Sequence, residues 1–88
     1  MPGSLIETWT DAMDAELEAR LGEASKLDDV ARYFKYTHLP AGAPRDMSRT
    51  FAYQAYEVLA RAPRCPQRTH ALNRLLESKD AAVRSVLP

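Results

Sequence analysis

The sequence predicts an all-α protein, in which an antiparallel helical hairpin and shorter N-terminal helices form an oligomeric helical bundle. Apolar residues recur at three- and four-residue spacing through most of the chain, and no segment alternates polar and apolar residues as a strand does. The 88 residues make one domain whose own core is thin, so association with further copies would stabilise it. We divide residues 1–88 into an acidic N-terminal helix, residues 1–24, and a core, residues 25–88.

The first helix is expected to begin at Ser4 and to end at Gly22. The Ser4 hydroxyl can cap the first turn while Glu7 reaches back to close a capping box. Glycine favours the conformation that ends a helix, so Gly22 is the natural stop. One face is a dense acidic band, and the other is apolar: Leu5, Trp9, Ala12, Met13, Leu17 and Leu21.

A short second helix is expected after Ser25, with Asp28 and Asp29 in its first turn, where the helix dipole favours acidic side chains. It should end near Tyr36, because a residue that precedes a proline, here Leu39, resists the helical conformation.

The third helix should start between Pro44 and Ser48, with Asp46 or Ser48 as its cap. Its apolar stripe consists of Met47, Phe51, Ala55, Val58 and Ala62. Two prolines, Pro63 and Pro66, then interrupt the helix.

The fourth helix should run from Pro66 to about Leu87 and pack antiparallel to the third, because the connection is so short. Its apolar side consists of Leu72, Leu75, Leu76, Ala82, Val83 and Val86. The N-terminal helices would lie across this hairpin.

The zero net charge hides a division along the chain. Residues 1–30 carry eight acidic residues against Arg20 and Lys26, a balance of −6, and residues 31–88 carry ten basic against four acidic residues, a balance of +6. Either the acidic part docks on the basic part, or the basic part receives an anionic partner. A protein that coats duplex nucleic acid would be basic overall, so no such partner is expected.

The composition favours neither catalysis nor a cofactor. The single Cys65 and the two isolated histidines, His38 and His70, provide no metal-ligand spacing, and no glycine-rich phosphate loop or paired carboxylates for catalysis stand out. We expect no enzyme activity, no metal and no cofactor. No segment approaches the length of a membrane span, and we expect a cytosolic protein with no membrane partner.

Two surfaces combine arginine with other functional groups. On the third helix, Arg45, Arg49, Tyr53 and Tyr56 lie opposite the apolar stripe. Either Tyr53 and Tyr56 cover the N-terminal helices or this face forms a subunit interface, and both can be true in a thin bundle. Around the hairpin turn lie Arg61, Arg64 and Arg68, which would make a phosphate site with the free amides of the helix start, or simply a solvated loop.

Aromatic and basic residues also crowd the stretch before the interhelical loop. We expect Tyr33 or Phe34 to serve the core, whereas Tyr36 and His38, next to the loop, are better placed to meet a ligand. Such rings can stack on a flat anionic molecule. The alternative is that all four rings, those of Tyr33, Phe34, Tyr36 and His38, serve the core.

Two segments, YFKYTHLP and SRTFAYQAYEVLARAPRCPQRTHALNRLLESKDAAVRSVL, resemble the phage anti-CBASS cyclic-oligonucleotide sponges over residues 33–87. The family's aromatic-Tyr-x-His-x-Pro box falls on Phe34, Tyr36, His38 and Pro40. Its turn and last helix fall on Pro66, Arg68, Ala71, Leu72 and Leu75.

The resemblance implies a phage protein of immune evasion, a homohexamer that sequesters nucleotide second messengers in the cytoplasm of the infected bacterial host. It implies a cyclic-dinucleotide site at Tyr36 or His38 with Arg49, and a cyclic-trinucleotide site at Arg68 with Thr69 and Asn73. The acidic N-terminal helix departs from the shorter members and could block a pocket or alter the assembly.

Two other functions remain open from the residues themselves. One is a small oligomeric helical module that occludes a host or phage protein through its tyrosine and arginine face. The other is an accessory DNA-binding protein, whose binding to duplex DNA would depend steeply on salt.

Overall fold

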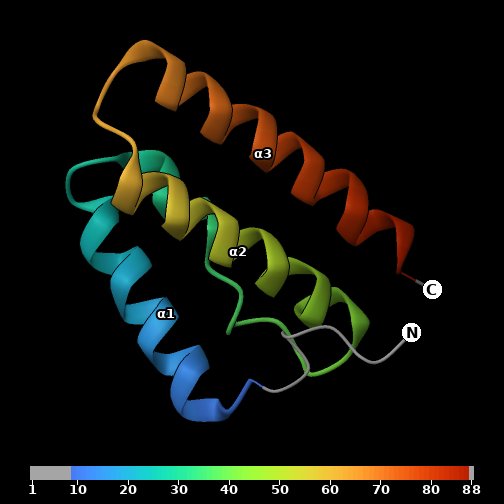
Figure 1. The fold of residues 1–88 in the computed structure, drawn as a ribbon. Helices are drawn as coiled ribbons and strands as arrows, with labels where there is room; N and C mark the ends of the chain where they lie inside the picture. Colours follow the sequence, from blue (N-terminus) through green and yellow to red (C-terminus); the bar gives the residue numbers. More distant parts are fainter. Residues whose placement is uncertain (1–8, 88) are drawn as a thin grey trace.

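The computed structural model describes residues 9–87, and the regular secondary structure of this part of the chain is helical, without strands. In chain order the elements are α1 (Asp11–Ser25), the 3₁₀ helix η2 (Asp29–Phe34), α2 (Ala43–Arg61) and α3 (Pro66–Ser85) (Figure 1). α2 contacts each of the other three elements and is the centre of the fold. The all-α prediction is confirmed.

α1 begins and ends later than predicted. Its N-cap is Thr10, whose hydroxyl accepts a hydrogen bond of 3.2 Å from the backbone N–H three residues further on. The predicted capping box of Ser4 and Glu7 lies outside the described residues. Gly22 does not end the helix, because it has none of the positive φ that marks a glycine stop, and α1 continues to Ser25.

The connection between α1 and α2 contains η2 instead of the predicted α-helix. The carboxylate of its N-cap, Asp28, makes no capping hydrogen bond and pairs with Arg68 of α3. At the other end, the backbone N–H of Lys35 donates to the carbonyl of Arg32 at 3.3 Å, which closes a three-residue turn. The backbone is extended at Lys35, so the helix stops short of Tyr36.

α2 begins at Ala43, one residue before the predicted range. Its N-cap is Gly42, at φ 137°, a conformation that glycine adopts readily because it lacks a Cβ atom. Neither predicted cap is used: Asp46 lies inside the first turn, and Ser48 is buried in the helix. Pro44 is tolerated in the first turn, where backbone N–H groups have no partner within the helix.

α2 and α3 lie side by side, joined by residues 62–65 (Figure 1). Pro63 lies in this connection and Pro66 is the first residue of α3, as the sequence predicts. α3 ends at Ser85, two residues before the predicted end.

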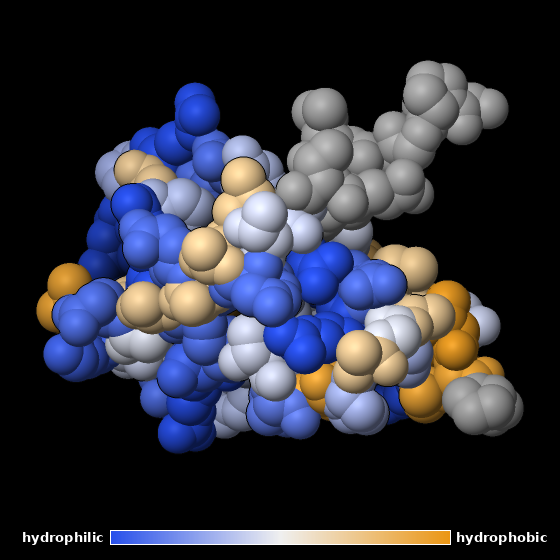
Figure 2. Space-filling model, turned by 90° about the horizontal axis from the view of Figure 1, so that it is seen from below, coloured by the Kyte–Doolittle hydropathy of each residue, from blue (hydrophilic) through white to orange (hydrophobic). Residues whose placement is uncertain are grey.

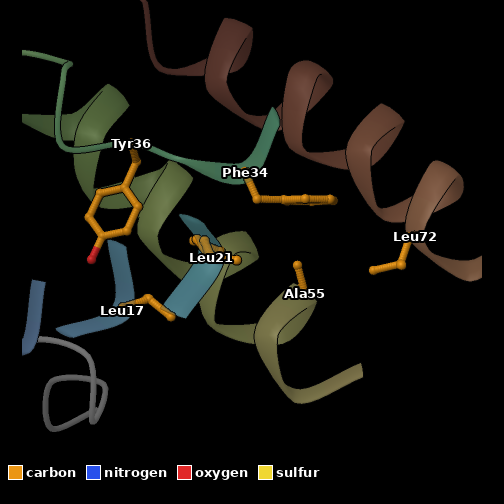
Figure 3. Close-up of a cluster of buried hydrophobic side chains, with 7 residues drawn as sticks. Leu17, Leu21, Phe34, Tyr36, Ala55 and Leu72 are labelled. Carbon is orange, nitrogen blue, oxygen red and sulfur yellow. The ribbon is translucent and has the colours of Figure 1, made fainter. Parts of the chain in front are cut away.

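The core forms where α1, η2, α2 and α3 meet (Figure 3). The large side chains of the fully buried cluster come from around α2, whereas α2 contributes two alanines to it and packs larger, partly buried side chains against it. Full burial of a side chain such as Phe34 or Leu21 contributes about 2–3 kcal/mol. The buried cluster comprises Leu17, Leu21, Phe34, Tyr36, Ala52, Ala55 and Leu72.

The buried face of α2 is rotated from the predicted stripe. Ala55 is buried as predicted, but the other fully buried positions are Ser48 and Ala52, and Phe51 and Val58 are half-buried. The cause is that α1 also packs on α2, along the face that carries the arginines and tyrosines. A helix with neighbours on more than one side has no single apolar stripe.

Most of the surface seen from below is hydrophilic, with hydrophobic atoms gathered at one end (Figure 2). The exposed large hydrophobic side chains of the described residues are Met13, Leu27, Tyr33, Tyr53 and Leu87. Two of them, Met13 and Tyr53, line a groove that is described below.

Candidate functional site

One buried carboxylate, that of Asp14 in the first turn of α1, is contacted by three polar side chains; its residue is 5% exposed. The Tyr36 hydroxyl donates to Oδ1 at 2.6 Å, and Arg49 donates from Nε to Oδ1 at 2.9 Å and from Nη2 to Oδ2 at 3.3 Å. Arg45 adds an ion pair at 3.7 Å, and the Nη1 of Arg49 reaches exposed Asp46 at 3.2 Å. Asp14, Tyr36, Arg45 and Arg49 are called the Asp14 cluster below.

Local geometry explains how these side chains meet. Arg45 and Arg49 are one helical turn apart and lie on the same face of α2. Phe34 and Tyr36 flank an extended residue, and side chains two apart in an extended segment point to the same side. Both rings leave the same side of the connecting segment (Figure 3).

The electrostatics of the cluster keep Asp14 charged and Tyr36 neutral. Burial alone raises the pKa of Asp14, but the hydrogen bonds from Tyr36 and Arg49 and the charges of Arg49 and Arg45 outweigh it, and the pKa lies below the usual 3.8. The pKa of Tyr36 is raised, first by burial and then by its hydrogen bond to Asp14. Burial lowers the pKa of Arg49, but the hydrogen bond and the charge of Asp14 raise it by more. The pKa is therefore raised overall, and the guanidinium stays charged. In this cluster three donor side chains therefore surround one carboxylate.

An open hollow of about 600 Å³ borders the cluster, with Asp14 and Arg45 in its lining together with Lys35. Part of the lining has little or no side chain, because α1 presents alanines and a glycine there: Ala15, Ala19 and Gly22. The Nε of Arg45 is buried and has no hydrogen-bond partner among residues 9–87. Arg45 thus lines the hollow and also has one unused, buried donor.

The structure changes the positions expected for the aromatic residues. Tyr36 has no exposed surface, so its ring is part of the core and is not free to stack on a ligand, and its hydroxyl contacts Asp14. Phe34 is buried as expected, and Tyr33 is 48% exposed. The reason is the extended backbone after η2, which sends Phe34 and Tyr36 to the core together. Of the remaining dinucleotide-site residues, Arg49 joins Tyr36 in the cluster and His38 is exposed.

The second expected set lies at the start of α3, beyond the far end of α2 from Arg49. Arg68 is largely buried: its Nη1 donates to the carbonyl of Ala62 at 3.0 Å, and its Nη2 pairs with Asp28. Thr69 and Asn73 are both exposed and lie one turn apart. The two expected sites thus occupy opposite ends of α2.

The predicted concentration of arginines at the turn is mostly neutralised within the chain. Arg61 pairs with Glu57 one turn earlier, and Arg68 pairs with Asp28. Arg64 is exposed, without an ion-pair partner among residues 9–87. A shallow hollow at the first turn of α3 is lined by Pro66, Gln67 and His70.

The division of charge along the sequence is resolved by contact within the chain. Asp14 pairs with Arg49, and Asp28 pairs with Arg68, so two of the least exposed ion pairs join the acidic first part to the basic second part. Of the two explanations for the charge asymmetry, docking of the acidic part is the one that the structure shows.

An apolar groove between α1 and α2 was not predicted from the sequence. The Trp9 and Tyr53 rings meet edge to face, with centroids 5.8 Å apart, and Arg20 donates to the Tyr56 hydroxyl at 2.6 Å. The groove is lined by Trp9, Ala12, Met13, Glu16, Leu17, Arg20, Tyr53 and Tyr56. Tyr53 and Tyr56 therefore cover the N-terminal helix within the chain, while Tyr53 remains 44% exposed.

The central role of Asp14 was also missed, although the spacing contained a signal for it. Asp14 precedes Leu17 by three residues and Leu21 by seven, which places it on the buried face of α1. The acidic residues of this helix therefore do not all belong to the band opposite the apolar face, because Asp14 shares the register of the buried leucines.

Comparison with protein-family models, with curated proteins and with solved structures finds no match for this chain. Among residues 9–87 no helix is long and apolar enough to cross a membrane. The same residues contain no group of three or more histidine, cysteine, aspartate or glutamate side chains placed to hold a metal ion.

Proposed function

We propose that this chain is a non-catalytic binding protein that sequesters cyclic dinucleotide and trinucleotide second messengers and so antagonises CBASS-type antiviral signalling in the bacterial cytoplasm. The observation that carries the proposal is the convergence of Tyr36, Arg45 and Arg49 on a single oxyanion. Guanidinium and hydroxyl donors that bind a carboxylate also bind a phosphate. Tyr36 and Arg49 are two of the residues that the sponge resemblance assigns to the dinucleotide.

A second proposed site, for cyclic trinucleotides, lies at the start of α3. Arg68 is held in place there by Asp28 and by a backbone carbonyl, next to exposed Thr69 and Asn73. The first turn of a helix presents backbone N–H groups and the positive end of the helix dipole, both of which favour a phosphate.

The proposed functional unit is a homo-oligomer, a hexamer by the resemblance, built from antiparallel hairpins of α2 and α3. What supports association is the thin packing of α3, of which only Leu72 is fully buried. Beyond its last turn Leu87 is 51% exposed. A second copy could cover such a helix more completely.

Isothermal titration calorimetry against a panel of cyclic dinucleotides and trinucleotides tests the proposal, with chromatography of the recovered nucleotide to check that it is unchanged. We expect binding without turnover. Thr69→Ala or Asn73→Ala should weaken trinucleotide binding by about fivefold to tenfold, the loss of one hydrogen bond. Ser78→Ala, an exposed position further along α3, is the matched control and should change nothing. Absence of heat across the whole panel would overturn the proposal.

A second candidate function is a protein-interaction module that occludes a host or phage protein, and the apolar groove favours it. The groove lies between two helices, which suits the apolar ridge of a partner's amphipathic helix, and its Glu16–Arg20 ion pair offers both charges to that helix. In this case Tyr53→Glu would abolish binding of the partner helix, and no cyclic nucleotide would raise the melting temperature. A nucleotide-dependent rise in melting temperature that Tyr53→Glu leaves intact would favour sequestration instead.

A further inference from the structure

We infer that the Asp14 carboxylate is an internal ligand that closes the oxyanion site of Tyr36, Arg45 and Arg49, and that an external carboxylate or phosphate replaces it when the first turn of α1 opens. The inference rests on the proposed function only for the identity of the natural ligand.

The donors and the acceptor of this site come from different parts of the chain. Tyr36 belongs to the segment after η2, and Arg45 and Arg49 belong to α2. α1 supplies only the acceptor, the carboxylate of Asp14. The ring of Tyr36 is fixed in the core, and the guanidinium of Arg49 lies 5.8 Å from its centroid. Removal of Asp14 would leave these donors in place around an unfilled anion position.

Only the first turn of α1 has to move for Asp14 to leave. Leu17 and Leu21 anchor the rest of the helix in the core, at 3% and 0% exposure. Before Asp14 the helix is held by the Thr10 cap and by the packing of Trp9 on Tyr53. Helix ends open locally far more readily than their buried middles, so the site can open without loss of the fold.

Space for a ligand larger than a carboxylate lies beside the closed site. The hollow of about 600 Å³ shares Asp14 and Arg45 with the cluster and adds the ammonium group of Lys35. Arg45 also has an Nε that is buried in the closed site and has no hydrogen-bond partner among residues 9–87. Two carboxylates also line the hollow: Asp11 would leave with the first turn, and Glu18, which accepts the backbone N–H of Tyr36 at 3.4 Å, would stay.

The cap of α1 provides the sharpest test. Thr10→Ala removes the hydrogen bond that closes the first turn and leaves every donor of the site intact, so the turn should open about threefold to tenfold more often. Apparent affinity for acetate and inorganic phosphate, measured from the Arg45 and Arg49 Nε–H resonances by NMR, should rise by the same factor, with chloride at equal ionic strength as the reference.

Ser25→Ala is the matched control at the other end of the same helix. The Ser25 hydroxyl donates to the carbonyl of Gly22 at 2.7 Å, so its loss weakens α1 without releasing Asp14. Affinity for phosphate should then stay at the wild-type value. Equal effects of Thr10→Ala and Ser25→Ala would overturn the inference.

Asp14→Asn gives an independent test, because it keeps the volume of the side chain and removes its charge. Phosphate should bind this variant at least about tenfold more tightly than wild type, and the added change Arg49→Met should abolish that binding. Phosphate affinity at or below the wild-type value would contradict an internal ligand. If Asp14→Asn does not fold, the two cap variants decide the question.

The outcomes separate this inference from the proposed function. If phosphate binds Thr10→Ala and Asp14→Asn as expected but no cyclic nucleotide does, the internal ligand stands and sequestration fails. If cyclic dinucleotides bind wild type and Thr10→Ala equally and leave the arginine resonances unchanged, sequestration stands and the internal ligand fails.

Discussion

The phenol of Tyr36 combines a ring in the core with a hydroxyl on a buried carboxylate, and phenylalanine could supply only the ring. Tyr36→Phe should lower the free energy of unfolding by about 1.5–3 kcal/mol, the contribution of a hydrogen bond to a charged group. Urea denaturation followed by circular dichroism measures the change.

Tyr33→Phe is the control for that experiment, three residues earlier in the chain. Tyr33 is 48% exposed and its hydroxyl accepts a hydrogen bond from Arg32 at the surface, so the same deletion should change stability by less than about 0.5 kcal/mol. Equal losses in the two variants would show that the hydrogen bond to Asp14 contributes little.

The lowered pKa of Asp14 makes part of the stability depend on acid. Because the folded pKa lies below the usual 3.8, the stabilisation is fully present above that pH and is lost as the pH falls through the folded value. Urea denaturation of wild type and Asp14→Asn at neutral pH and at about pH 2 tests this. The difference between the two proteins should shrink in acid, and a constant difference would contradict the assignment.

At this scale the sequence showed which residue types matter but not how they pair. Arg45 and Arg49 could be placed on one face of a helix from their spacing alone. That a carboxylate from residues 1–30 would satisfy them depends on how two helices pack, which no local pattern contains. The same holds for Arg68, whose partner Asp28 lies 40 residues away.

Among the helices, the proline positions were the most informative part of the sequence. α3 begins at Pro66 as predicted, and α2 begins one residue before the predicted range of Pro44 to Ser48, because proline is well tolerated in the first turn of a helix. The predicted helix end at Gly22 was wrong, because a glycine ends a helix only where tertiary contacts impose a positive φ on it. η2 was predicted in the right place but with the wrong geometry, because a six-residue helix takes its form from its neighbours.

Gly22→Ala should stabilise the protein by about 0.5–1 kcal/mol. Gly22 lies inside α1 without a positive φ, and an added Cβ would meet only the flexible end of Lys35, at 3.6 Å. Thermal and urea denaturation measure the gain.

Gly42→Ala should have the opposite sign. At φ 137° an L side chain is strained, so we expect a loss of at least about 1 kcal/mol even though the space around the position is open. A gain at both glycines would mean that backbone conformation does not control these positions.

In the whole molecule, the acidic and basic parts are joined by ion pairs that water barely reaches. The side chains of Asp14, Arg49, Asp28 and Arg68 are 7–17% exposed. Salt screens such pairs weakly, so raising NaCl from about 0.05 M to about 0.5 M should lower the free energy of unfolding by less than about 1 kcal/mol. A collapse of stability at high salt would show that long-range attraction between the two parts holds the fold together.

Lys26→Ala, which breaks an exposed pair with Glu23, should change stability by less than about 0.5 kcal/mol at either salt concentration.

The attachment of α3 is uneven along its length. Arg68 fastens its start to two other segments, Leu72 is its one fully buried residue, and Lys79 reaches the carbonyl of Tyr33 at 2.6 Å. Beyond Lys79 no residue of α3 is fully buried. Amide hydrogens near Ser85 should therefore exchange with deuterium soonest, and protection should increase toward Leu72. The C-terminal end of α3 would then open first, while its N-terminal end stays attached to the rest of the fold.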